Sequence, residues 1–305
     1  MPRTEIFLVT YAPDFDFTSY TLRSIAKFGR GFSGITIVVP YRDGDLFEPL
    51  ARKHGCNLRL FYEAAGKGFL HHQVVKCEAD LWCPKGTELV AHIDSDCVFK
   101  EPFSVDTFMH NGKPILVRER YSDFQHYPAR ASWQKCVEHA LGFEMPWETM
   151  VRHPGVFWAE MYREMRTWIE DRHGYPFTQY VLLQRNEFPQ TFAEFPTLGG
   201  FALGVAWWQE RYSAVTRVLT PSEYWRDHGI LPMARGSDGK PIGVVDLSGA
   251  DGGVDYNQFG GGTDYNLFGS DVSTHNALVS PVHYFWSRRG VTPEIRAKLE
   301  DILGS

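Results

Sequence analysis

The 305-residue chain has no apolar run of about 18 residues, so no membrane-spanning helix is predicted. Its first stretch, MPRTEIFLVTYAPDF, lacks the long apolar region and the small-residue cleavage site of a secretory signal peptide. Basic residues are not in excess, because 31 Lys and Arg stand against 37 Asp and Glu and give a net charge of -6. This balance argues against an obligate nucleic-acid binder, although a local basic groove stays open.

Cysteine is scarce, with five residues, an odd number, and no pair at CxxC spacing: Cys56, Cys77, Cys83, Cys97 and Cys136. This pattern argues against a disulfide framework and against a zinc site. We therefore expect reduced thiols in a cytoplasmic protein.

The first hundred residues alternate between strand and helix patterns. Predicted strands are the apolar runs at 5–11, 34–40, 57–63 and 88–94, and predicted helices lie between them at 18–29, 46–55 and 70–82. This order predicts an α/β fold with a mainly parallel, doubly wound sheet. In such sheets ligands bind beyond the carboxyl ends of the strands, where Asp14 and the Asp94–Asp96 pair are expected.

The second half is less regular. Helices are predicted at 155–174, 204–218 and 292–303. Residues 248–273 are rich in Gly, Asp and Asn and are interpreted as either a flexible surface loop or a mobile lid over a substrate. We expect residues 1–120 to form a nucleotide-binding half and residues 121–305 an acceptor-binding half of one compact domain.

Asp94 and Asp96 follow an apolar strand in the stretch ELVAHIDSDCVFKEPF. Burying two neighbouring carboxylates is costly unless a cation offsets their charge. In an extended segment residues i and i+2 point to the same side, so both carboxylates could bind one hard divalent cation. The alternative is a pair of turn or helix-capping aspartates.

The segment VAHIDSDCVFKEPF (90–103) resembles the D-x-D segment of GT-A fold glycosyltransferases. The preceding HHQVVKCEAD (71–80) resembles the helix that leads into that strand in a poorly characterised bacterial and viral branch of this superfamily, where a Gln and a Lys stand at similar places. RHPGVFW (152–158) and FAEFPTLGGFA (192–202) also resemble segments of that branch. The resemblance covers roughly residues 5 to 205, with a weaker tail to 290.

The resemblance implies a GT-A-like Rossmann-type α/β/α sandwich and a nucleoside-diphosphate sugar donor, a UDP-sugar before others, with Mn²⁺ or Mg²⁺. By this analogy Asp96 binds the metal directly, and Asp94 contacts the metal through water or the ribose, with Ser95 between them. Tyr11 and Asp14 match where this fold holds the base and ribose. Lys76 would lie near phosphate or the donor sugar, and the alternative is a solvated helix lysine.

Further site residues are expected from the second half. His283 is a candidate metal ligand or a hydrogen-bonded core residue. Glu194 is the best candidate for a catalytic base that deprotonates the acceptor hydroxyl, together with Asp96 at the metal, or else it is a surface residue of a loop. His153 and Trp158 are candidate acceptor contacts, although His153 could instead cap a helix. A retaining enzyme would need no base.

Two other functions remain open at this stage. A haloacid-dehalogenase-type phosphohydrolase would use Asp94 as its nucleophile, but that family places the nucleophile after the first strand, whereas three strands precede Asp94 here. The chain could also be a non-catalytic nucleotide-sugar-binding protein. The acceptor of a transferase could be a glycan, a lipid, a small molecule or a modified nucleic-acid base, and in the last case we expect Arg118, Arg120 and Arg130 to contact it.

Overall fold

The structure is a computed structural model that describes residues 1–124, 128–150, 154–185, 192–216, 230–232, 244–246, 282–284 and 290–304. His153 and the glycine-rich segment 248–273 lie outside these residues, and so does Arg130 as regards its side chain. No described helix is both long enough and apolar enough to cross a membrane.

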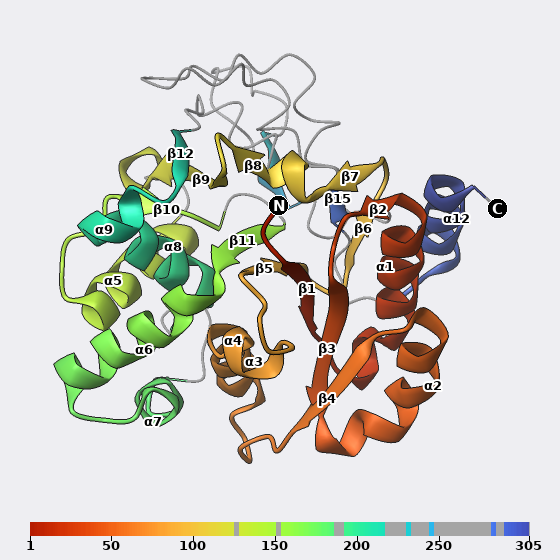
Figure 1. The fold of residues 1–305 in the computed structure, drawn as a ribbon, viewed down its shortest axis with the longest axis horizontal. Helices are drawn as coiled ribbons and strands as arrows, with labels where there is room; N and C mark the ends of the chain where they lie inside the picture. The colour runs from red at the N-terminus through yellow and green to blue at the C-terminus, as the bar shows by residue number, and fades with distance from the viewer. Residues whose placement is uncertain are drawn as a thin grey trace.

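A five-stranded sheet forms the centre of the molecule, in the order β11-β5-β1-β3-β4 (Figure 1). Its strands are β1 (Thr4–Val9), β3 (Gly34–Pro40), β4 (Asn57–Phe61), β5 (Leu89–His92) and β11 (Gly155–Trp158). The first four are parallel, and β11 is antiparallel to β5. The predicted α/β fold with a mainly parallel central sheet is therefore confirmed.

The apolar strands form because both faces of the sheet are covered. Along β1, Phe7 and Val9 belong to one hydrophobic cluster, and Ile6 and Leu8 belong to another. This alternation follows from the two-residue period of a strand. Each of these four side chains is at most 2% exposed, which fixes the register of the central strand.

Helices cover both faces of the sheet (Figure 1). The face with Ile6 packs against α1 (Phe15–Phe28) and α2 (Gly44–His54), and α12 (Pro293–Leu303) packs on α1. The face with Phe7 packs against a larger group, which consists of α3 (Gly68–Cys77), α4 (Ala79–Trp82), α5 (Pro128–Leu141), α6 (Ala159–His173), α7 (Phe177–Leu182), α8 (Glu194–Gly204) and α9 (Ala206–Gln209). The result is an α/β/α sandwich.

A smaller sheet lies beside the central one. It has the order β10-β9-β12, with β8 paired to β9, and consists of β8 (Met109–His110), β9 (Lys113–Arg120), β10 (Trp147–Glu148) and β12 (Ser213–Thr216). Three two-stranded pairs complete the strands: β2 (Gly29–Arg30) with β7 (Phe103–Ser104), β6 (Cys97–Phe99) with β15 (Val282–Tyr284), and β13 (Ile230–Pro232) with β14 (Val244–Asp246). Short 3-10 helices occupy Ala12–Asp14 (η1), Tyr41–Asp43 (η2), Val105–Phe108 (η3) and Tyr121–Phe124 (η4).

Three helix predictions need correction. Residues 155–158 form strand β11, so the helix predicted at 155–174 begins at Ala159. The helix predicted at 204–218 is the short α9 followed by β12, and the one predicted at 70–82 is divided into α3 and α4. The cause is tertiary, because β11 and β12 complete sheets whose other strands lie far away in sequence.

The two expected halves share one sheet. Strand β11 comes from the expected acceptor half and pairs with β5 of the expected nucleotide half.

All five cysteines are free thiols in the structure. Burial raises the pKa of the Cys56 thiol to about 12, and it also raises the pKa of Cys77 and Cys97. A raised pKa keeps these thiols in their protonated form near neutral pH.

The contact between α1 and α12 gives a pH-dependent prediction. Glu300 accepts hydrogen bonds from Arg23 at 2.9 Å and from Tyr20 at 2.8 Å. The bond from Arg23, followed by the bond from Tyr20, lowers the pKa of Glu300 to about 2. A lowered carboxyl pKa contributes stability above the ordinary carboxyl pKa, and this contribution is lost as the pH falls toward 2.

We expect Glu300→Gln to lower the Tm at pH 7 by about 1–3 °C, since the pair is partly exposed and screened by water. The Tm difference from the wild type should shrink as the pH falls below about 4.5. Thermal melts followed by circular dichroism from pH 7 to pH 3 test this, with Glu48→Gln as the control for an exposed pair within one helix. A Tm difference that stays constant over this range would contradict the prediction.

Candidate functional site

The candidate site lies at the carboxyl ends of three neighbouring parallel strands. Strand β1 leads to Tyr11 and η1, β3 leads to η2, and β5 leads to Asp94. Asp14 in η1 is 6% exposed, and Tyr11 is 38% exposed. The backbone N–H of Ala12 donates to Asp43 at 3.0 Å, so the loop after β3 holds the loop after β1.

Residues 94–97 form a tight turn in which the N–H of Cys97 donates to the carbonyl of Asp94 at 3.1 Å. The expected extended conformation of residues 94–96 is therefore wrong. Because the segment is a turn, the two-residue period of a strand does not place the side chains of Asp94 and Asp96 on one side. The hydroxyl of Ser95 donates to Asp14 at 2.9 Å, and the hydroxyl of Thr21 donates to the carbonyl of Ser95 at 2.6 Å. Side chains of η1 and α1 therefore hold the turn in place.

Lys76 joins two carboxylates at this edge. Its ammonium group donates to Asp94 Oδ1 at 2.8 Å and to Glu194 Oε1 at 2.9 Å, and it lies 4.6 Å from the centre of the Phe195 ring. The side chain is only 8% exposed. Burial alone would lower the pKa of Lys76, but the two carboxylates more than offset this effect, and the pKa is raised. Lys76 is therefore a buried, charged residue of the site and not a solvated helix lysine.

Glu194 is the first residue of α8, and its side chain is 13% exposed. The contact with Lys76 corrects the alternative of a surface glutamate in a loop. Lys76 and Glu194 are 118 residues apart in the chain, and they meet because α3 and α8 pack against each other on the same face of the central sheet. No local sequence pattern indicates this pairing.

Two further residues of α3 lie near Lys76, of which the sequence analysis noted the Gln and missed His72. His72 Nε2 and Gln73 Oε1 are buried and have no hydrogen-bond partner in the described part of the chain. Burial, and then the positive charge of Lys76, lowers the pKa of His72, so its imidazole is neutral at pH 7. The signal was the run HHQVVK, in which polar residues recur within one helical turn of Lys76.

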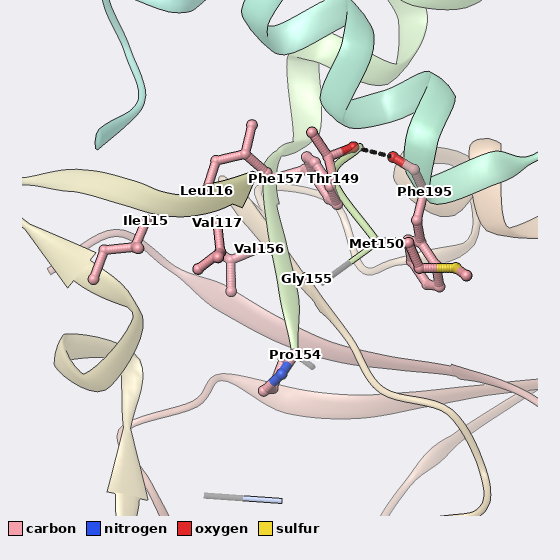
Figure 2. A pocket seen from close by; sticks show the side chains of 10 residues that line it. All are labelled: Ile115, Leu116, Val117, Thr149, Met150, Pro154, Gly155, Val156, Phe157 and Phe195. Atoms are coloured by element: carbon pink, nitrogen blue, oxygen red, sulfur yellow. Dashed lines mark hydrogen bonds between the residues drawn. The ribbon is translucent and has the colours of Figure 1, made fainter. Parts of the chain in front are cut away.

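A small pocket between β9 and β11 is lined in part by Phe195, the residue that follows Glu194 (Figure 2). It is lined by Ile115, Leu116, Val117, Thr149, Met150, Pro154, Gly155, Val156, Phe157 and Phe195. Gly155 pairs with His92, the last residue of β5, so the pocket reaches the end of the strand that carries Asp94. The Thr149 hydroxyl donates to the carbonyl of Phe195 at 3.2 Å, which fixes the start of α8 at the pocket wall (Figure 2).

Two other predicted site residues, His283 and Trp158, lie on strands β15 and β11. His283 is in β15, and its backbone pairs with Val98, two residues beyond Asp96. Trp158 ends β11 opposite Leu89, at the far end of β5 from Asp94, and its indole donates to the carbonyl of Arg211 at 3.3 Å. Its role as an acceptor contact stays a prediction.

The residues at the edge suit a hard divalent cation. Asp94 and Asp96 supply the carboxylate oxygens that Mg²⁺ and Mn²⁺ prefer, and two carboxylates with water and substrate phosphates are a common magnesium ligand set. In the described residues no three His, Cys, Asp or Glu side chains form a metal-binding group. Any cation at Asp94 must also share this carboxylate with Lys76.

No family model matches the chain, and no curated protein does. The chain is similar to the apo structure of mouse xyloside xylosyltransferase 1, with 13% identity, 74% of this chain and 90% of that chain covered, and a TM-score of 0.40. It is also similar to 4-diphosphocytidyl-2C-methyl-D-erythritol synthase from Anaerococcus prevotii, with 12% identity, 70% and 87% covered, and a TM-score of 0.40. Likenesses of this size identify no substrate. The α/β fold with a mainly parallel central sheet rests on the strand order and layers described above.

The Lys76 contacts predict a large effect on stability. We expect Lys76→Met to lower the free energy of unfolding by about 3 kcal/mol, because it leaves Asp94 and Glu194 close together without their shared cation. Lys67→Met is the matched control, since Lys67 precedes the same helix and, among the described residues, its side chain donates only to the carbonyl of Gln184. Urea unfolding at pH 7 measures both variants, and equal losses would contradict the assigned role of Lys76.

Proposed function

We propose that the protein is a glycosyltransferase that moves a sugar from a nucleoside-diphosphate sugar to a hydroxyl group of an acceptor. The observation that carries this proposal is the gathering of Asp14, Lys76, Asp94, Asp96 and Glu194 around the carboxyl edge of a parallel sheet. Ligands of such sheets bind at this edge. The mixture of carboxylates and one lysine suits a donor that carries a diphosphate and a sugar.

The donor nucleoside is proposed to bind at the loops after β1 and β5. Tyr11 offers an exposed aromatic ring for the base, a UDP-sugar being the first candidate donor. Asp14 accepts a hydrogen bond from Ser95 and is suited to hold the ribose hydroxyls through its carboxylate. Because Asp43 and Thr21 fix these loops, the binding surface is largely formed before the donor arrives.

Asp96 and Asp94 are proposed to hold Mn²⁺ or Mg²⁺, with His283 as a third ligand. The bound cation would supply electrostatic stabilisation of the negative charge on the leaving diphosphate. Lys76 is proposed to contact the diphosphate or the donor sugar. It is already buried and charged at the edge, so it needs no change of protonation to do so.

Glu194 is proposed to act as the base in an inverting reaction. Lys76 holds one of its carboxylate oxygens, so the other oxygen has to reach the acceptor hydroxyl. The pocket beside Phe195 lies next to this carboxylate and is the proposed position of the acceptor, with His153 in the neighbouring segment as a further contact. The alternative, a phosphohydrolase with Asp94 as nucleophile, would instead release phosphate from a generic aryl phosphate without any nucleotide sugar.

A ligand-binding experiment tests the proposal without knowledge of the acceptor. We expect UDP or a UDP-sugar together with Mn²⁺ to raise the Tm, since a ligand that binds the folded state stabilises it by mass action. With the ligand at about its Kd for the wild type, Asp96→Asn should abolish about 80–90% of this Tm increase, which corresponds to about a tenfold loss of affinity. Asp106→Asn, an exposed residue of η3, should leave it unchanged.

The panel contains nucleoside diphosphates and nucleotide sugars of all bases, each with Mn²⁺ and with EDTA. Binding that needs Mn²⁺ and one nucleotide supports the proposal and identifies the base. The absence of any nucleotide effect in the presence of metal would overturn it. Binding without transfer or hydrolysis would instead indicate a nucleotide-sugar-binding protein.

A further inference from the structure

One face of the small sheet carries two arginines and a tryptophan. Arg118 and Arg120 are two residues apart in β9, so their side chains stand on the same face. Arg120 pairs with Trp147 of β10, and Arg118 pairs with Thr216 of β12. Glu119 is 1% exposed, and the two-residue period puts it on the opposite face.

Both guanidinium groups lie over the same indole ring. The guanidinium carbon of Arg118 is 4.0 Å from the ring centre of Trp147, and that of Arg120 is 5.5 Å from it. Arg118 Nε donates to the hydroxyl of Thr216 at 3.0 Å. The stacking and this hydrogen bond fix the orientation of the planar guanidinium group of Arg118. Its two terminal nitrogens remain for another hydrogen-bond acceptor.

This arrangement is electrostatically unfavourable without an anion. Burial, and then the positive charge of Arg120, lowers the pKa of Arg118. In the described part of the chain neither arginine forms an ion pair with a carboxylate. The half-buried Arg118 is therefore held near a second positive charge, that of the exposed Arg120, which costs free energy.

Arg211 shows the contrasting, purely structural arrangement. Its guanidinium carbon lies 4.4 Å from the ring centre of Trp158 and 4.6 Å from that of Trp208, so it is stacked at least as extensively as Arg118. Unlike Arg118, it is paired with a carboxylate, that of Glu160. Arg211 thus combines stacking on tryptophan with a balanced charge, whereas Arg118 has the stacking without the ion pair.

We propose that Arg118, Arg120 and Trp147 form a binding site for a phosphate group. Two guanidinium groups match the oxygens of a phosphate, which can accept parallel hydrogen bonds from the planar fork of an arginine. An anion placed between them would remove the repulsion that the free protein tolerates. Nothing in this step requires a sugar donor or a metal.

The position of this site indicates what would carry the phosphate. Ile115, Leu116 and Val117 of the same strand line the pocket beside Phe195, next to Glu194. The arginines follow directly along β9, so a molecule in the pocket can extend to them. This step rests on the proposed function: the acceptor is a phosphate-bearing molecule whose hydroxyl lies at Glu194 and whose phosphate lies between Arg118 and Arg120.

The test measures the binding of inorganic phosphate by calorimetry, at constant ionic strength maintained with sodium chloride and without donor or metal. We expect saturable binding that is weakened at least tenfold in Arg118→Gln and in Arg120→Gln. Arg118→Lys keeps the positive charge but loses the planar, bidentate hydrogen-bond donors of the guanidinium group, so it should bind phosphate with intermediate affinity. Arg211→Gln is the matched control and should bind phosphate as the wild type does.

Stability in phosphate-free buffer separates binding from packing. If the site serves an anion, Arg120→Gln should have a Tm equal to or above that of the wild type, because one of two like charges is removed. Absence of saturable phosphate binding in the wild type, or an equal loss of affinity in Arg211→Gln, would overturn the proposal. A large drop in Tm together with unchanged phosphate affinity in the Arg118 and Arg120 variants would also overturn it, by assigning them a packing role.

Two further titrations distinguish the sources of the phosphate. A sugar phosphate carries a monoester, and a dinucleoside phosphate carries a diester with rings that can stack on Trp147. Tighter binding than inorganic phosphate by either one identifies the class of acceptor. Because no donor is present, phosphate binding can succeed while the nucleotide panel fails, and the two proposals are then judged separately.

Discussion

The candidate site depends on one buried ammonium group, that of Lys76, between the carboxylates of Asp94 and Glu194. These carboxylates come from the end of β5 and the start of α8, and each would be costly to bury alone. The lysine comes from α3, which packs against α8. One ion cluster therefore ties the parallel sheet, where we propose that a donor binds, to the helices beside the proposed acceptor pocket.

This contact constrains the chemistry at the edge. A divalent cation at Asp94 meets a carboxylate that already has a positive partner, so the cation and Lys76 must share it or Lys76 must turn away. Glu194 provides a second partner that keeps the ammonium group buried and hydrogen-bonded in either case. A diphosphate arriving with the metal offers Lys76 further oxygen acceptors, so donor and metal binding would support each other.

The sequence indicated the parts of this picture that depend on local pattern. The four parallel strands are continuous apolar runs, and their order with the helices gives the fold class and the position of Asp94 at a strand end. The turn at Ser95, the strand at Val156 and the pairing of Lys76 with Glu194 could not be predicted. Each depends on segments that are distant in sequence: Asp14 for the turn, β5 for the strand and α8 for the lysine.

The arginines of β9 show how an unfavourable arrangement can indicate function. A chain with 37 acidic residues could place a carboxylate beside Arg118, as it does for Arg211, Arg166 and Arg23. Selection for stability alone favours such a pair or the loss of one arginine. Keeping both over one indole makes sense if an external anion completes the charge balance, and strain of this kind is concentrated at binding sites. The net charge of -6 does not conflict with a phosphate-bearing acceptor, because the local field at β9, and not the total charge, decides where a phosphate binds.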